Sequence, residues 1–86
     1  MGKVQVGTIL HYFPKVGVAV VSLSGELKVG DRISVEGGAT AAFEQVVDSM
    51  QIEHKNIEGA KAGDDIGLKV VERVHEKDAV YKVTEE

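Results

Sequence analysis

The stretch Val4-Gln5-Val6-Gly7-Thr8-Ile9-Leu10-His11-Tyr12 decides how the chain begins to fold. The alternate positions of this stretch hold Val4, Val6, Thr8, Leu10 and Tyr12, which are mostly apolar, whereas Lys3, Gln5, Gly7 and His11 occupy positions of the other parity. Successive side chains of a strand point to opposite faces, so this pattern predicts a strand of about ten residues with one buried face. Pro14 cannot donate to a strand ladder, and we expect the strand to end there.

Further short apolar segments follow, separated by turns. They are residues 16–23, 33–35, 66–70 and 79–83. Valine is the most common residue, and β-branched side chains favour strands over helices. We therefore predict an all-β protein: a single small closed antiparallel barrel of about six to seven strands that occupies residues 1–86 as one domain without repeats. The expected core is Val4, Val6, Leu10, Val18, Val20, Ile33, Val35, Val46, Met50, Ile52, Ile66, Leu68, Val70, Tyr81 and Val83.

Residues 40–55 fit two structures. Phe43, Val46, Val47 and Met50 have the i, i+3, i+4, i+7 spacing of an amphipathic helix, which Thr40 could cap. The same stretch also alternates as a strand from Val46 onward, provided that a bulge or bend near residues 45–48 corrects the phase. Periodicity alone leaves both structures open.

Charge and composition exclude several classes of protein. The net charge is −4, and the basic residues are scattered between acidic ones, which disfavours tight binding to nucleic acid through phosphate contacts. The chain has no cysteine, which excludes disulfides and thiolate chemistry and fits a reducing compartment. No apolar stretch is long enough to span a membrane, and the N-terminus lacks the apolar core of a signal peptide, so we expect a cytoplasmic protein.

Catalytic and metal-binding patterns are also missing from the sequence. His11, His54 and His75 lie in different segments, without the close spacing of a metal site. The serines lack a nucleophile-elbow context, and the sequence has no glycine-rich phosphate loop. We expect no enzyme activity, no cofactor, no metal and no bound nucleotide; the chain is expected to be a binding module.

Three segments resemble domain 2 of the translational GTPases, the family of elongation factor Tu. The segments are Leu27-Lys28-Val29-Gly30-Asp31-Arg32-Ile33, Ser49-Met50-Gln51-Ile52, and Ala60-Lys61-Ala62-Gly63-Asp64-Asp65-Ile66-Gly67, after a weaker match at Val6-Gly7-Thr8-Ile9. Gly30-Asp31 and Gly63-Asp64 fit turns in which glycine adopts a left-handed conformation and aspartate accepts from turn amides. Gly67 would let its strand bend at a barrel corner. The resemblance implies one long bent strand from Phe43 to His54.

The resemblance also implies a function. In elongation factor Tu-like proteins the barrel helps to hold the aminoacyl end of tRNA beside a GTPase domain, and this chain lacks the P-loop and guanine-reading motifs of that domain. The implied function is a non-catalytic accessory module that docks to a protein or ribonucleoprotein of the translation machinery. The alternative is direct binding of a tRNA or RNA 3′ end through Gln51, His54 and Asp65. His54 keeps the residue type of the family position, whereas Gln51 and Asp65 depart from it.

Overall fold

The computed structural model describes residues 2–38, 42–53 and 55–84, and these residues form ten β-strands. The strands are β1 (Gly2–Phe13), β2 (Val18–Leu23), β3 (Leu27–Lys28), β4 (Arg32–Glu36), β5 (Phe43–Val46), β6 (Met50–Ile52), β7 (Lys55–Ile57), β8 (Gly59–Ala60), β9 (Asp65–Lys69) and β10 (Ala79–Thr84). The all-β prediction is confirmed, although the described residues form more strands than the expected six to seven.

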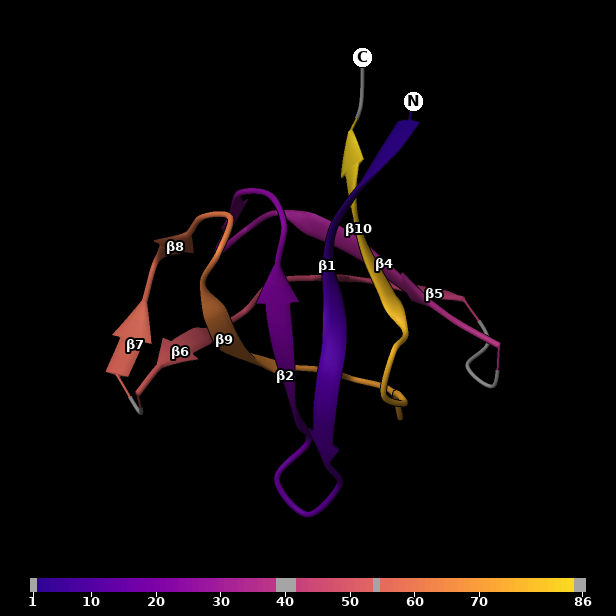
Figure 1. Cartoon of the computed structure of the whole chain (residues 1–86), viewed down its shortest axis with the longest axis horizontal. Coiled ribbons are helices and arrows are strands. Elements are labelled where there is room, and N and C mark those ends of the chain that lie inside the picture. The colour runs from indigo at the N-terminus through magenta and orange to yellow at the C-terminus, as the bar shows by residue number, and fades with distance from the viewer. Residues whose placement is uncertain (1, 39–41, 54, 85–86) are drawn as a thin grey trace.

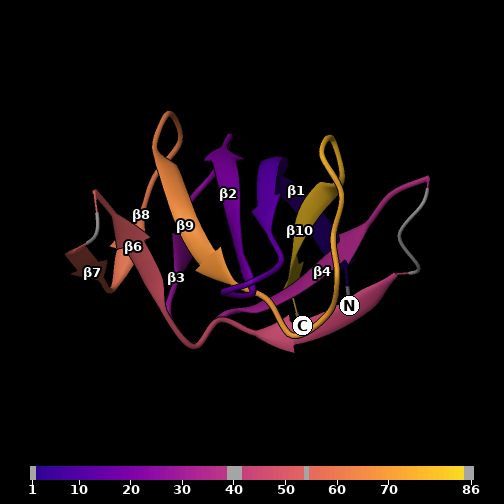
Figure 2. The same cartoon turned by 90° about the horizontal axis from the view of Figure 1, so that it is seen from below.

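Eight strands form one antiparallel sheet in the order β5-β4-β10-β1-β2-β9-β6-β7, and β3 pairs with β8 in a small second sheet. The large sheet curls around the core, with β1 and β2 at its centre (Figure 1). Seen from below, β6 and β7 lie at one side of the curled sheet and β4 extends to the other, with β9, β2, β1 and β10 between them (Figure 2). The prediction of a closed barrel is therefore wrong: the sheet is a curled, open half-barrel.

A side chain spans the open side of the sheet where a closed barrel needs a backbone ladder. The Gln45 amide on β5 donates through Nε2 to the Lys69 carbonyl at 2.8 Å and accepts at Oε1 from the Val71 N–H at 2.9 Å. Closure demands that every strand find a backbone partner on both sides. Here one amide group connects β5 to the segment that leaves β9, and the edges of β5 and β7 stay open among the described residues.

The segment of residues 43–53 is neither a helix nor one long strand. β5 pairs with β4 at one edge of the sheet, whereas β6 pairs with β7 and β9 near the opposite edge. Between them the chain crosses below the core, as the trace from β5 to β6 shows in Figure 2. Val47 lies in this crossing and is 1% exposed, whereas Val46 is 46% exposed. The predicted change of phase near residues 45–48 is thus a crossing between two strands.

The core contains apolar side chains from most of the strands. In several strands, however, the alternate residues that are buried are not the ones predicted. Val4 and Leu10 are exposed, while Val6 and Ile9 are buried. The register of β1 shifts twice, between Gln5 and Gly7 against β10 and between Ile9 and His11 against β2. Each irregularity breaks the simple alternation on which the prediction depended.

Two other strands also bury the parity opposite to the expected one. In β2 the buried residues are Ala19, Val21 and Leu23, and Val18 and Val20 are only half-buried. In β10 the buried residue is Val80, whereas Tyr81 and Val83 are half-buried. Both segments carry apolar residues on both parities, so alternation did not determine the buried face. This leaves Val18 and Val20 on the outer face of the sheet.

One turn geometry occurs three times. In residues 28–31 and 61–64 the aspartate N–H donates to the lysine carbonyl, and Asp31 Oδ2 or Asp64 Oδ2 accepts from the lysine N–H at 2.9 or 3.1 Å. Gly30 and Gly63 have φ angles of 97° and 94°, which glycine adopts without strain. Residues 75–78 repeat both hydrogen bonds, but Lys77 takes the third position with φ 73°.

Two of these turns belong to a repeated unit. Residues 27–33 and 60–66 each place a short strand, the turn and the start of a longer strand in the same order, and the short strands β3 and β8 pair with each other. No repeat was expected from the sequence, because the two segments share only lysine, glycine, aspartate and isoleucine at matched positions.

Candidate functional site

The outer face of β2, β9 and β6 carries a groove. Its lining comes from the β1–β2 hairpin, from these three strands and from the turn after β6: Phe13, Val16, Val18, Val20, Gln51, Glu53, Asp65, Ile66 and Gly67. The groove has a volume of about 520 Å³, within the range of about 300–1,000 Å³ that is common for ligand sites. It is the hollow that we consider as the candidate functional site.

The floor of the groove lies at Gly67, where β9 carries no side chain. Gly67 in β9 pairs with Val20 in β2 on one side and with Gln51 in β6 on the other. A Cβ atom added at Gly67 would lie 3.5 Å from Val18 Cγ1 and 3.8 Å from the Gln51 carbonyl oxygen, which are ordinary contacts. The glycine therefore does not relieve a clash; it leaves a space between two strands that carry side chains.

The wall on the β2 side is apolar and ordered by cross-strand contacts. Phe13 pairs with Val18, so both side chains lie on the outer face. The His11 ring packs against Phe13 edge to face, with 4.5 Å between the ring centroids, and His11 Nδ1 lies 3.2 Å from Glu76 Oε2. Val16 at the hairpin tip is 65% exposed.

The opposite wall is polar and acidic. Gln51 donates through Nε2 to Asn56 Oδ1 at 3.0 Å, which leaves its Oε1 able to accept another hydrogen bond. Glu53 and Asp65 add two exposed carboxylates, and neither lysine nor arginine lines the groove. Lys69 follows on the same face of β9 but lies outside the lining.

The structure thus brings together two of the three residues expected to form a binding site. Gln51 and Asp65 both line the groove, and His54 lies outside the described residues. Sequence reasoning missed the apolar wall, because it placed Val18 and Val20 in the core and Phe13 in a connection. The remaining signal was the apolar hairpin tip, with Phe13 and Val16 on either side of Pro14.

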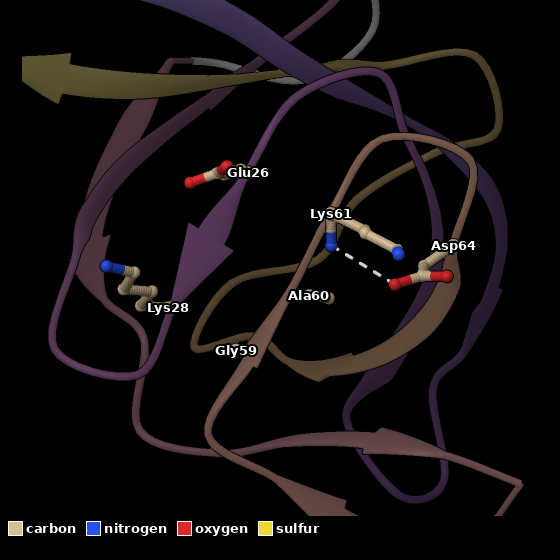
Figure 3. Close-up of a pocket in the computed structure, with 6 residues that line it drawn as sticks. All are labelled: Glu26, Lys28, Gly59, Ala60, Lys61 and Asp64. Carbon is tan, nitrogen blue, oxygen red and sulfur yellow. Dashed lines mark hydrogen bonds between the residues drawn. The ribbon is translucent and has the colours of Figure 1, made fainter.

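A second hollow lies beside the small β3–β8 sheet. It has a volume of about 340 Å³, and its lining is Glu26, Lys28, Gly59, Ala60, Lys61 and Asp64 (Figure 3). Asp64 is already engaged there, because its Oδ2 accepts from the Lys61 backbone N–H at 3.1 Å. The other charges are of both signs and exposed. The lining of this hollow thus combines the turn of residues 61–64 with side chains of both charges, and it does not favour one class of ligand.

Four of the five residues that were predicted to have a structural role lie in turns, and the fifth, Gly67, lies in a strand. Gly30, Asp31, Gly63 and Asp64 occupy the two glycine turns described above. None of the four lines the groove, although Asp65, which does, directly follows Asp64. Gly67 lies in the middle of β9 and is paired on both sides.

No metal-binding cluster is found in the described ranges, 2–38, 42–53 and 55–84. Within them, no group of three or more histidine, aspartate or glutamate side chains could hold a metal ion. The pKa of Lys3 is raised because its ammonium donates a hydrogen bond to Glu36 at 2.7 Å, but this pair is an exposed contact between β1 and β4, and neither residue lines the groove. The part of the chain that the structure describes contains no helix long and apolar enough to cross a membrane.

Curated relatives of this chain are named as proteases. Over 83 residues, or 96% of this chain, the sequence is 42% identical to the "Uncharacterized protease MJ0090" of Methanocaldococcus jannaschii. Over 81 residues, or 93% of this chain, it is 36% identical to a collagenase of Porphyromonas gingivalis. The chain spans 20% of the length of each of these relatives. No family model matches the chain.

The fold is that of a solved domain. The C-terminal domain of a Geobacillus thermoleovorans protein assigned to the U32 peptidases superposes with a TM-score of 0.89 at 22% identity, covering 93% of this chain and 92% of that one. The selenomethionine variant of the same domain superposes with a TM-score of 0.86 at 22% identity, covering 90% and 96%.

These comparisons overturn the resemblance to domain 2 of the translational GTPases. The similar sequences are named proteases and collagenases, and the similar structures are a domain of a U32 peptidase. The predictions of docking to the translation machinery and of binding a tRNA or RNA 3′ end depended on that resemblance, and they are wrong as well. The glycine–aspartate motifs misled because they report turn chemistry: residues 75–78 build the same turn without the motif.

Proposed function

We propose that this chain is a non-catalytic domain of a U32-type peptidase, and that it assists the peptidase by holding polypeptide in the groove beside Gly67. The observation that carries the proposal is the match of nearly the whole chain, 96% of it at 42% identity, to only 20% of a much longer protease. A segment of that proportion leaves most of the protease to supply the catalytic groups.

The chemistry of the chain supports a non-catalytic role. Peptide hydrolysis needs a nucleophile activated by a base, or a metal ion that activates water. The sequence has no cysteine, and the described residues hold no metal-ligand cluster. His11 is paired with Glu76 and packed against Phe13, which supports the groove wall; among the described residues, no serine or threonine hydroxyl forms a hydrogen bond with its ring.

The shape of the chain supports a separate folding unit. It has its own core, and a domain of the same fold and nearly the same extent has been crystallised without the rest of its peptidase. A self-contained domain with an outer-face groove can add binding surface to a catalytic unit without taking part in the reaction.

A gelatin-cleavage assay tests this function. In the Porphyromonas gingivalis collagenase, the segment that matches this chain would be deleted in one variant and replaced by this chain in a second. We expect this chain alone to cleave nothing, the deletion variant to lose most activity and the chimera to regain it. Cleavage by the isolated chain, or full activity in the folded deletion variant, would contradict the proposal.

A further inference from the structure

We infer that the groove binds an extended peptide segment in which aliphatic side chains neighbour lysine or arginine. The inference rests on the proposed function, since it names the chemistry of the polypeptide that the domain would hold. Three properties of the groove lead to it: its width, its apolar wall and the sign of its charge.

The width of the groove favours an extended chain. Its side walls are carried by β2 and β6, which flank β9, so they lie about 10 Å apart, twice the usual spacing between strands. A helix with its side chains is itself about 10–12 Å in diameter and would not enter between these walls. An extended segment directs successive side chains to opposite sides, so a segment lying over the Gly67 floor can turn one row of side chains to the apolar wall on β2 and the other row to the acidic wall on the side of β6.

The apolar wall favours aliphatic side chains. Val16 and Phe13 expose 65% and 46% of their surface, and Val18 and Val20 are half-buried beside them. These side chains come from both strands of one hairpin and from its tip, so they form a continuous apolar strip along one side of the floor. Covering this strip removes apolar surface from water, which is the main source of binding free energy for such a segment.

The charge of the groove selects the neighbouring residues. Among the described residues that line the groove, Glu53 and Asp65 alone are charged, both are acidic, and the net charge of the whole chain is −4. A cationic side chain next to the buried aliphatic one would meet these carboxylates, whereas an acidic segment would be repelled. The same charge disfavours RNA, whose phosphates would face Glu53 and Asp65, and it disfavours a second copy of this acidic chain.

The test is a titration of the isolated ¹⁵N-labelled chain with a blocked hexapeptide in which leucine and lysine alternate. We expect shifts of the Val18, Val20, Gln51 and Gly67 amides. Two control peptides, with glutamate in place of lysine or serine in place of leucine, should cause none. Substituting Glu53→Asn and Asp65→Asn should weaken binding about two- to five-fold for each charge removed; asparagine also tolerates the φ of 51° at Glu53.

Two matched variants locate the binding on the surface. Val16→Ser and Val71→Ser remove equally exposed valines, 65% and 66% exposed, but only Val16 lines the groove. We expect Val16→Ser to weaken binding about five-fold and Val71→Ser to leave it unchanged. Gly67→Leu should fill the floor and abolish binding, and the Val16 pair decides the question if that variant does not fold.

Each other outcome overturns the inference. These outcomes are equal binding of the glutamate peptide, equal loss in both valine variants, shifts of the same amides by a single-stranded RNA oligonucleotide, or a dimer that buries them. The proposed function fails separately: an inactive chimera with normal peptide binding would refute the domain's role in the peptidase and leave the groove as a peptide site. An active chimera that does not bind the leucine–lysine peptide would refute only the inference about peptide chemistry, because the proposed function does not specify which side chains the held polypeptide carries.

Discussion

Substituting Gly37→Ala should destabilise the protein far more than substituting its neighbour Gly38. A Cβ atom at Gly37 would overlap Asp78 Oδ1 and lie 2.7 Å from Asp78 Cγ, and Asp78 is 4% exposed. At Gly38 the added atom would meet nothing within 4 Å. Both glycines are exposed and have no positive φ, so the contact with Asp78 is the difference between them.

The magnitude follows from what Asp78 must give up. Its Oδ2 accepts from the His75 N–H at 2.8 Å and closes the turn of residues 75–78, and moving the carboxylate away from a new methyl group breaks this bond. Loss of a hydrogen bond to a buried charged group costs about 2–3 kcal/mol. In a domain of this size that free energy corresponds to a fall in Tm of roughly 10–20 °C.

Thermal unfolding followed by circular dichroism measures both variants. We expect Gly38→Ala to stay within about 0.5 kcal/mol of the parent chain. In an Asp78→Ala background, Gly37→Ala should cost less than about 1 kcal/mol, because the overlapping carboxylate is gone. Equal melting of Gly37→Ala and Gly38→Ala, or an undiminished cost in the Asp78→Ala background, would refute this reasoning.

Three further predictions concern the sheet opening, a strained turn and an ion pair. Gln45→Ala should lower the free energy of unfolding by about 1 kcal/mol in urea titrations, because both hydrogen bonds across the open side are lost. An unchanged urea midpoint would show that these two hydrogen bonds do not stabilise the fold. Lys77→Gly should raise stability by about 0.5–1 kcal/mol, since Lys77 has φ 73°, whereas Gly63→Ala should lower it, and the opposite signs would be incompatible with the turn geometry. The raised pKa of Lys3 means that its pairing with Glu36 adds stability at pH values below its ordinary value of 10.5 and that this is lost as the pH rises through the pKa of the folded protein. Lys3→Met should therefore flatten the alkaline fall of Tm, and an unaltered profile would count against the pair.

Local turn chemistry could be predicted from the sequence, because it depends on a few adjacent residues. A glycine followed by aspartate at residues 30–31 and 63–64 is sufficient to specify the left-handed backbone and the side-chain acceptor. The strand positions of β1, β2, β4, β9 and β10 were also predictable, because each is an apolar segment bounded by turns.

The buried face and the closure of the sheet could not be predicted, because they depend on partners far away in sequence. The irregularities of β1 appear only when it is paired with β10 and β2, and they move burial from Leu10 to Ile9. The gap at β5 is spanned by Gln45, whose backbone partners are 24 and 26 residues away.

The candidate site was predictable only in part. Gln51 and Asp65 emerged as site residues through a resemblance that the comparisons overturn, although both line the groove. Val18 and Val20 were assigned to the core because an apolar run cannot show which of its two faces is buried. Gly67 was expected to bend its strand, and its place in the groove lining, between Val20 and Gln51, could not be predicted without the register of β2, β9 and β6.

The central claim is that the domain supports a peptidase by binding polypeptide and not by chemistry. The most direct measurement is the kcat and KM of gelatin cleavage by the collagenase chimera that carries this chain, with and without Val16→Ser, and with Val71→Ser as the control. We predict that Val16→Ser raises KM about five-fold at unchanged kcat, while Val71→Ser changes neither. A fall in kcat at constant KM, or no difference between the two valine variants, would contradict the account.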